Sequence, residues 1–161
     1  MTHFEKYTLL LQAFVAIAAF VSVYLVLRQV KKMGSQIEAT QQASEAQSII
    51  SIVQFLQSVE ARQARETVRA SLSKAHHEQW TEEQARNAAF VCANYDVVAA
   101  LLRAGLIKNK QVILDNWGPS IQHCHQVLVP YIDNKRRAPG GNQKYWSNFD
   151  WLSAQCSEHR A

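Results

Sequence analysis

Two short runs of this sequence contain side chains of the kinds that bind metals or catalyse hydrolysis. The first, His123-Cys124-His125, offers two imidazoles and a thiol, which are the donors that zinc prefers in proteins. In a helix, residues i and i+2 point about 200° apart, so this run cannot hold one ion. The sequence also has no CxxC or HxxxH pair. We therefore expect no metal and no cofactor; a site assembled by folding from Cys92, Cys124, Cys156 and a histidine stays open.

The second run begins at Arg69 and ends at His76, with six residues between them. This spacing resembles the arginine-to-histidine spacing of a superfamily of helical ribonucleases, in which such a pair stabilises a scissile phosphate and transfers a proton. Ala70 stands where a polar residue usually follows the arginine. A ribonuclease-like effector that uses Arg69 and His76 is therefore kept as an alternative function, and the main interpretation assigns no catalytic residue.

No other pattern indicates an enzyme. Glu82-Glu83 falls in the first turn of a predicted helix, where carboxylates stabilise the helix dipole. The five glycines form neither a phosphate-binding loop nor a dinucleotide fingerprint, and there is no GxSxG motif. We therefore expect a protein that binds rather than catalyses.

A cluster of cations and aromatic residues near the C-terminal end is the strongest candidate for an interaction surface. Such residues can recognise phosphate headgroups, nucleic acid or an acidic partner. They also have a structural interpretation, because basic residues stabilise helix ends and aromatic rings pack between helices. The candidate surface consists of Lys135, Arg136, Arg137, Tyr145, Trp146 and Trp151.

The elements that would position these residues follow from the hydrophobic pattern. Of the 161 residues, 48% are apolar, and Tyr7–Leu27 holds 18 apolar residues in 21 positions without a charge. As a helix it would cover about 31 Å, which matches a hydrocarbon core of about 30 Å. The residues before it carry no net positive charge, unlike those of a signal peptide. We predict an uncleaved transmembrane anchor over residues 1–33, with Tyr7–Leu27 contacting the lipid bilayer.

The net charge of +4 sets the orientation of this anchor. Glu5 and Lys6 cancel, Arg28, Lys31 and Lys32 contribute +3, and residues 33–161 contribute +1. Because basic residues stay on the inner side of a membrane, we expect the N-terminus outside and the rest of the chain in the cytoplasm. The pI of about 9.1 then results mainly from the basic residues at the inner end of the membrane helix. We therefore do not expect nucleic acid as a partner. The three cysteines should be thiols in that reducing compartment.

Residues 34–48 are predicted to form a helical stalk, because Gln36–Ser48 is rich in helix formers and poor in large apolar residues. Alanines and apolar residues from Ala39 to Val53 fit about two heptads, fewer than the three or four of a stable coiled coil. A homo-oligomer is thus an open alternative. Large apolar residues return at Ile49, which starts the predicted helical domain over residues 49–161.

The domain is predicted to contain four or five helices and no strand. The first runs from Ile49 through the charged, solvated stretch Glu60–Arg69, and Lys74–Trp80 follows as a loop. Thr81 and Gln84 predict a capping box, and Gly105 ends that helix. Further helices are expected over Asn109–Trp117, Pro119–Arg136 and Gln143–Glu158, separated by Gly118-Pro119 and by the loop of residues 138–142.

Three segments of the C-terminal half resemble one bacterial family, known as domain of unknown function 4760. They are VCANYDVVAALLRAGLI (Val91–Ile107), LVPYIDNKRR (Leu128–Arg137) and YWSNFDWL (Tyr145–Leu152). The resemblance covers roughly residues 50–155, and Gly118-Pro119 is where this sequence looks least typical of it. It implies a short bacterial protein with an N-terminal membrane helix, a charged connector and a compact helical domain. It implies no reaction and no catalytic residues.

These observations predict an all-α protein with a single N-terminal transmembrane helix, a helical stalk and a cytoplasmic helical domain. The main functional interpretation is a bacterial inner-membrane protein whose domain acts as a non-enzymatic interaction, scaffold or sensor module for a protein partner. Two alternatives stand beside it: the membrane-tethered ribonuclease-like effector, and an accessory subunit of a larger membrane complex.

Overall fold

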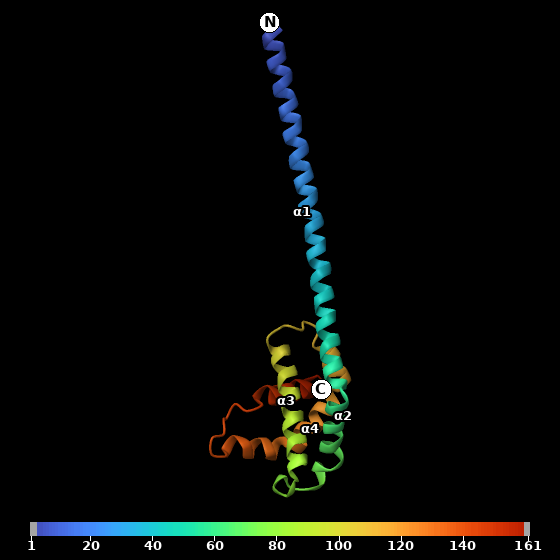
Figure 1. Cartoon of the computed structure of the whole chain (residues 1–161), viewed down its shortest axis with the longest axis vertical. Helices are drawn as coiled ribbons and strands as arrows, with labels where there is room; N and C mark the ends of the chain where they lie inside the picture. The colour runs from blue at the N-terminus through green and yellow to red at the C-terminus, as the bar shows by residue number, and fades with distance from the viewer. Residues whose placement is uncertain (1–2, 160–161) are drawn as a thin grey trace. The chain divides into compact units, whose positions relative to one another are not determined.

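The structure is a computed structural model that describes the backbone of residues 3–159 and the side chains of residues 14, 15 and 17–159 (Figure 1). Within that range it contains only helices, so the predicted all-α class is confirmed. The elements are α1 (His3–Gln57), α2 (Val59–Ala70), the 3-10 turns η1 (Leu72–Lys74) and η2 (His77–Gln79), α3 (Glu82–Arg103), α4 (Gln111–Arg137) and α5 (Ser147–Glu158).

The chain divides into two compact units, residues 1–44 and 45–161. α1 passes through Gly34 without a break. A glycine inside a helix costs only about 1 kcal/mol, and the good helix formers on both sides outweigh that cost. The segment predicted as a stalk is therefore part of the same helix as the residues before it.

The predicted membrane span is not supported by the residues that the structure describes. Among them, no helix has an apolar stretch of the length needed to cross a bilayer. The side chains of residues 7–13 and 16, which belong to the predicted span Tyr7–Leu27, lie outside the described part.

The helix predicted to run on from Ile49 is interrupted at Ser58, so the prediction of one continuous helix is wrong. Ser58 has extended backbone angles, φ −55° and ψ 152°, and its hydroxyl accepts a hydrogen bond from the Ala61 N–H at 3.2 Å. This is an N-cap, which compensates for the unpaired amides at the start of α2. α2 therefore begins as a new helix with its own cap after Ser58.

The charged stretch of α2 is less solvated than its sequence predicts. Ala61, Ala64 and Val68 are buried, and Arg65 is only 6% exposed. The Arg65 Nη2 donates a 2.6 Å hydrogen bond to the carbonyl oxygen of Leu56, in the last turn of α1. The carbonyls there have no partner within the helix, so the guanidinium compensates for one of them and for the negative end of the helix dipole.

α3 begins and ends as its sequence predicts. Thr81 accepts from the Gln84 N–H at 3.2 Å, and the Gln84 side chain accepts from the Thr81 N–H at 2.8 Å, which completes the capping box. Gly105 follows the last turn with φ +69°, a left-handed conformation that favours glycine.

The predicted interruption at Gly118-Pro119 is wrong, because α4 is one helix from Gln111 to Arg137 with Pro119 and Pro130 inside it. Proline normally forces the preceding residue out of the helical region, since its ring clashes with that residue's Cβ. Gly118 has no Cβ and so tolerates the helical conformation before Pro119. It is buried, and a Cβ built there would lie 3.8 Å from the Cys156 Sγ of α5.

The second unit has one hydrophobic core, in which α3 contacts α2 and α5, and α4 contacts the same two helices (Figure 1). Its largest fully buried side chains include Tyr95, Phe149, Leu56, Ile113, Ile121 and Leu128. All three cysteines are buried and none forms a disulfide. Burial raises the pKa of the Cys92 thiol above its ordinary range and that of Cys124 to about 11, so both stay protonated at neutral pH.

Candidate functional site

Arg136, a member of the predicted interaction surface, is an internal contact that fixes α5. Its Nη2 lies 2.5 Å from Asp150 Oδ2, and its Nε and Nη2 donate to the Tyr145 carbonyl at 2.9 and 2.7 Å. The other Asp150 oxygen lies 2.9 Å from the His125 Nε2. The Arg136 side chain is 15% exposed, so its charge is used within the domain.

The aromatic members of that surface also pack within the domain. Trp146 stacks on Tyr131 with ring centroids 5.9 Å apart, and Trp151 lies under the Arg103 guanidinium at 5.7 Å. Tyr145 keeps 45% of its surface exposed.

The other two cations of the predicted surface lie on α4. Lys135 lies 5.5 Å from the Tyr131 ring. Arg137 is exposed, and its Nε donates to the Asp133 carbonyl at 3.2 Å.

A different set of cations lines a hollow of about 470 Å³ between α2 and α4. Three arginines at 3- and 4-residue spacing, Arg62, Arg65 and Arg69, place their side chains on one face of α2. We call this hollow the arginine groove. Its remaining lining residues are Gln57, Val59, Gln63, Glu66, Trp117 and Ser120.

The arginine groove carries an excess of positive charge. Glu66 is its one acidic lining residue against three arginines, and none of the three has an ion pair with a carboxylate among the described residues. Burying a charge is costly unless it is paired. The buried Arg65 guanidinium donates to the Leu56 carbonyl, and the single carboxylate of the groove leaves an excess of two positive charges among its lining residues. The groove is therefore suited to an anion.

The positive potential of the groove extends into the core through α4. The Ser120 hydroxyl lies 3.1 Å from the Tyr95 hydroxyl. Burial raises the pKa of Tyr95, while the hydrogen bond from Ser120 and the charges of Arg65 and Arg69 act in the opposite direction. The same two arginines lower the pKa of Cys124 against the larger effect of burial.

Arg69 and His76, the pair of the ribonuclease alternative, line different hollows. Arg69 belongs to the arginine groove, and His76 lines two other hollows on the side of α4 that holds Pro130.

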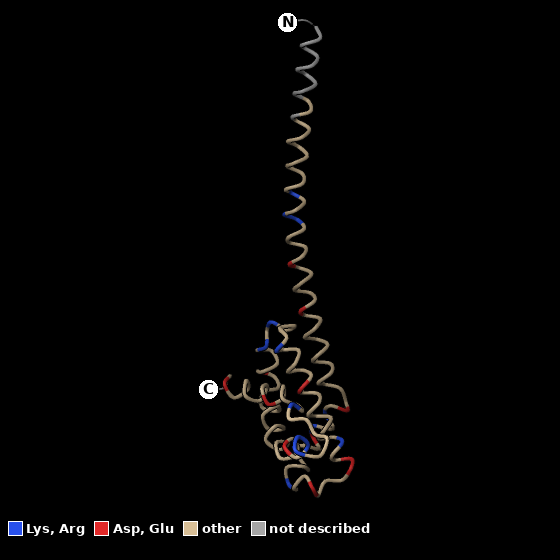
Figure 2. Tube along the Cα trace, turned by 90° about the vertical axis from the view of Figure 1, so that its left-hand side faces the viewer, with Lys and Arg blue, Asp and Glu red and all other residues tan. Residues whose placement is uncertain are grey.

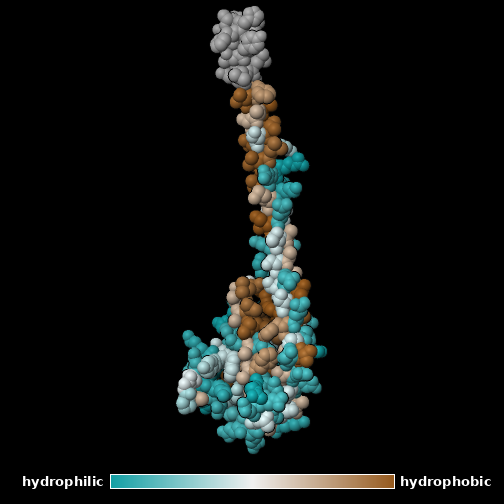
Figure 3. All heavy atoms as spheres, viewed as in Figure 1, coloured by the Kyte–Doolittle hydropathy of each residue, from teal (hydrophilic) through white to brown (hydrophobic). Residues whose placement is uncertain are grey.

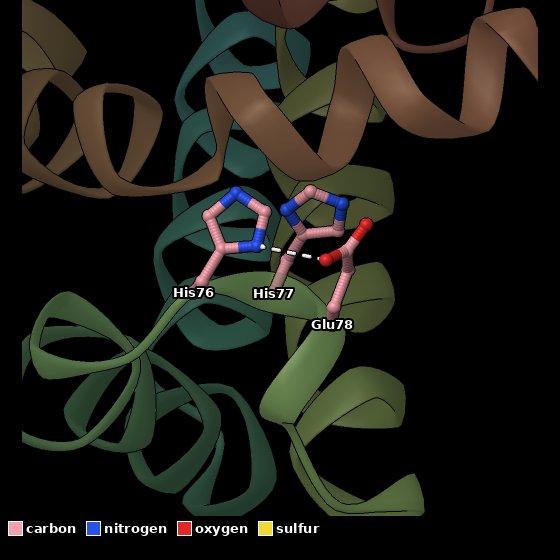
Figure 4. Close-up of side chains that lie close together, drawn as sticks. All are labelled: His76, His77 and Glu78. Carbon is pink, nitrogen blue, oxygen red and sulfur yellow. Dashed lines mark ion pairs between the residues drawn. The ribbon is translucent and has the colours of Figure 1, made fainter.

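The loop predicted over Lys74–Trp80 brings His76 together with two residues that no sequence motif pointed to. His76, His77 and Glu78 each offer one ligand atom, and these atoms lie within 4.8 Å of one another (Figure 4). His123, from the rejected run His123-Cys124-His125, lines one hollow together with His76 and His77 but is not part of this set. Cys124 is buried, and His125 pairs with Asp150.

The fold and these hollows define the class of the protein: an all-α protein whose helical domain carries a basic, partly buried groove. The family model described as domain of unknown function (DUF4760) matches residues 10–156, so the chain belongs to this family, and the resemblance stated from its sequence is confirmed. Comparisons with curated proteins and with solved structures gave no match.

Proposed function

We propose that this protein is a membrane-anchored, non-enzymatic binding module whose helical domain takes an acidic segment of a partner protein in the arginine groove. The observation that carries the binding role is the nearly buried Arg65 guanidinium, flanked by Arg62 and Arg69 and without a carboxylate partner among the described residues. The proposal places Tyr7–Leu27 in a bacterial inner membrane and the helical domain in the cytoplasm.

The anchor is supported by the sequence of α1 and by the exposure of its apolar side chains. Phe14 is 70% exposed and Phe20 78%, and the consecutive residues Leu25, Val26 and Leu27, which point to different sides of the helix, are all more than half exposed. The face of this segment that Figure 3 shows is largely apolar. A helix that is apolar on every side needs an apolar environment. The basic residues that follow, Arg28, Lys31 and Lys32, form the blue band of α1 in Figure 2 and favour the inner leaflet.

A topology experiment tests the anchor. A cytoplasm-active reporter fused after residue 161 should be active, and the protein should stay in the membrane fraction after an alkaline carbonate wash. Replacing Ile17 and Ala18 by arginine should release the protein, because each charge at the centre of a span costs about 2.5–3.5 kcal/mol. The matched control replaces Gln41 and Gln42, which lie beyond the span, by arginine and should stay in the membrane. Release of the wild-type chain would contradict the anchor.

The acidic partner is supported by charge and by size. Three guanidiniums can bind carboxylates through paired N–H donors. A hollow of about 470 Å³ accepts one or two acidic side chains, while Trp117 supplies an apolar wall. Gln57, Gln63 and Ser120 add uncharged groups that can donate hydrogen bonds along the same groove.

A binding experiment with the full chain tests the groove. In nanodiscs of phosphatidylcholine, a fluorescein-labelled peptide of six glutamates should bind, with affinity falling as salt is raised. Arg69→Glu should weaken binding at least tenfold, because a hydrogen bond to a charged group contributes about 1.5–3 kcal/mol and about 1.4 kcal/mol is a factor of ten.

Arg86→Glu is the matched control, since it makes the same charge change on an exposed arginine of α3 that pairs with Glu82 at 3.1 Å. It should bind the peptide as the wild type does. Equal losses in the two variants would mean that only the net charge matters, and no binding by the wild type would contradict the groove as an acidic-segment site.

A further inference from the structure

The turn η2 and the residue before it hold three metal-ligating side chains close together. The His76 and His77 rings have centroids 4.3 Å apart, and the His76 Nδ1 lies 3.6 Å from a Glu78 carboxylate oxygen. Figure 4 shows the two rings side by side, with the Glu78 carboxylate next to His77. One nitrogen of each ring and one carboxylate oxygen therefore already face a common volume.

The backbone explains why consecutive residues can do this here. His76 is extended, with φ −65° and ψ 144°, and only the next residues turn into η2. The helical spacing that separates residues i and i+2 in His123-Cys124-His125 does not apply to His76 and Glu78. The Trp80 Nε1 donates to the Ala75 carbonyl at 3.0 Å, and this hydrogen bond links the two ends of the turn.

His77 provides an independent observation. Both of its ring nitrogens are buried, and neither has a hydrogen-bond partner among the residues that the structure describes. A neutral imidazole has one donor and one acceptor, and buried polar atoms are nearly always paired. Trp80 contacts the same ring edge-on with centroids 6.2 Å apart, so it supplies an aromatic wall. A ligand that accepts a lone pair from His77 would compensate for the buried nitrogen.

We propose that His76, His77 and Glu78 form a binding site for a divalent ion of the zinc class, with water completing its coordination. Two imidazoles and a carboxylate are typical protein ligands of Zn²⁺ and suit Co²⁺, Ni²⁺ and Cu²⁺ as well. The His76 and Glu78 side chains are 58% and 73% exposed, so they can rotate to the shorter distances that an ion requires. His77 is the fixed ligand of the three.

The surroundings offset part of the charge of such an ion. Asp133 and Arg137 of α4 line the hollow that also holds His76 and His77, and their charges offset each other. Glu78 then contributes the net negative charge beside the ion. The site is separate from the arginine groove, because the two hollows share no lining residue, so it does not depend on the proposed binding of an acidic segment.

Calorimetry on the full chain in detergent, purified without a histidine tag, tests the site. Zn²⁺ should bind with a stoichiometry of one. His77→Ala and His76→Ala should each weaken the affinity at least tenfold, and Glu78→Gln should weaken it severalfold. His123→Ala is the matched control, because His123 shares a hollow with His76 and His77 but does not belong to the set whose ligand atoms lie close together, and it should keep the wild-type affinity.

Cu²⁺ identifies the ligands directly. Its electron paramagnetic resonance spectrum should show two nitrogen ligands in the wild type, one in His76→Ala and two in His123→Ala. Wild-type affinity in both His76→Ala and Glu78→Gln, or an equal loss in His123→Ala, would overturn the proposal. His76 and Glu78 are exposed, so these two variants are informative even if His77→Ala does not fold.

Discussion

Phe149→Ala should lower the free energy of unfolding by about 3–5 kcal/mol, the range for removing a buried aromatic ring. Phe149 is fully buried, stacks on Tyr95 with centroids 5.2 Å apart and meets the His125 ring edge-on at 5.0 Å. Its loss would leave a cavity between α3, α4 and α5. Urea unfolding of the full chain in detergent, followed by tryptophan fluorescence, measures the change.

Phe90→Ala is the control for this prediction. Phe90 lies on α3 and is 40% exposed, so its truncation removes far less buried surface and should cost no more than about 1 kcal/mol. Similar costs for Phe149→Ala and Phe90→Ala would contradict the packing of α5 described above.

Gly141→Ala should be the most damaging single-methyl change in the described part of the chain. A Cβ at this position would meet the carbonyl oxygen of Lys135, and would lie 2.7 and 2.8 Å from those of Arg136 and Ala138. Those carbonyls belong to the C-terminal end of α4 and its cap, which cannot move without opening the helix end. We expect a loss at or above the upper end of the about 1–3 kcal/mol of overpacked sites.

Gly34→Ala is the matched change, because a Cβ at Gly34 has no atom within 4 Å. Alanine there should stabilise α1 by about 0.5–1 kcal/mol, the difference in helix propensity. Thermal unfolding by circular dichroism compares the two. A melting temperature unchanged by Gly141→Ala would mean that the turn after α4 can rearrange, contrary to the close contacts seen here.

The features that the sequence predicts well are those whose causes lie within a few residues. The Thr81 capping box and the glycine after α3 involve neighbours along the chain, so residue types and spacing suffice. The all-α class follows for the same reason, because helical periodicity is a local property. The membrane segment is also a local prediction, but the side chains of its first residues fall outside the part of the chain that the structure describes.

The features that the sequence does not predict depend on distant residues. α5 starts at Ser147 without a local cap; instead, Asp96 of α3 accepts from the Asn148 and Phe149 N–H groups at 2.9 and 3.1 Å. Arg65 looks solvated by its pattern, yet the break at Ser58 brings it onto Leu56. Neither Asp96 as the cap of α5 nor Leu56 as the acceptor for Arg65 can be predicted from the spacing of residues along the sequence.

The candidate sites show the same difference between features with local causes and features that depend on distant residues. The candidate interaction surface joined residues that are near in sequence, and the fold uses Arg136 and Trp146 for internal contacts. The arginine groove does have a sequence signal, three arginines at 3- and 4-residue spacing, which was interpreted as a solvated face. The histidine cluster has no recognisable spacing in the sequence, because its three ligands are consecutive and are brought together by the extended backbone at His76.

The dependence of α5 on Asp96, His125 and Arg136 has a consequence for the chain during its synthesis. α2, α3 and α4 leave the ribosome before α5 exists, and until then the places of Phe149, Leu152 and Cys156 in the core are empty. Nascent domains with an incomplete core expose apolar surface and are prone to aggregation. Chains that stop before residue 147 should therefore bind chaperones or be degraded, and quality control would distinguish finished from unfinished copies by α5.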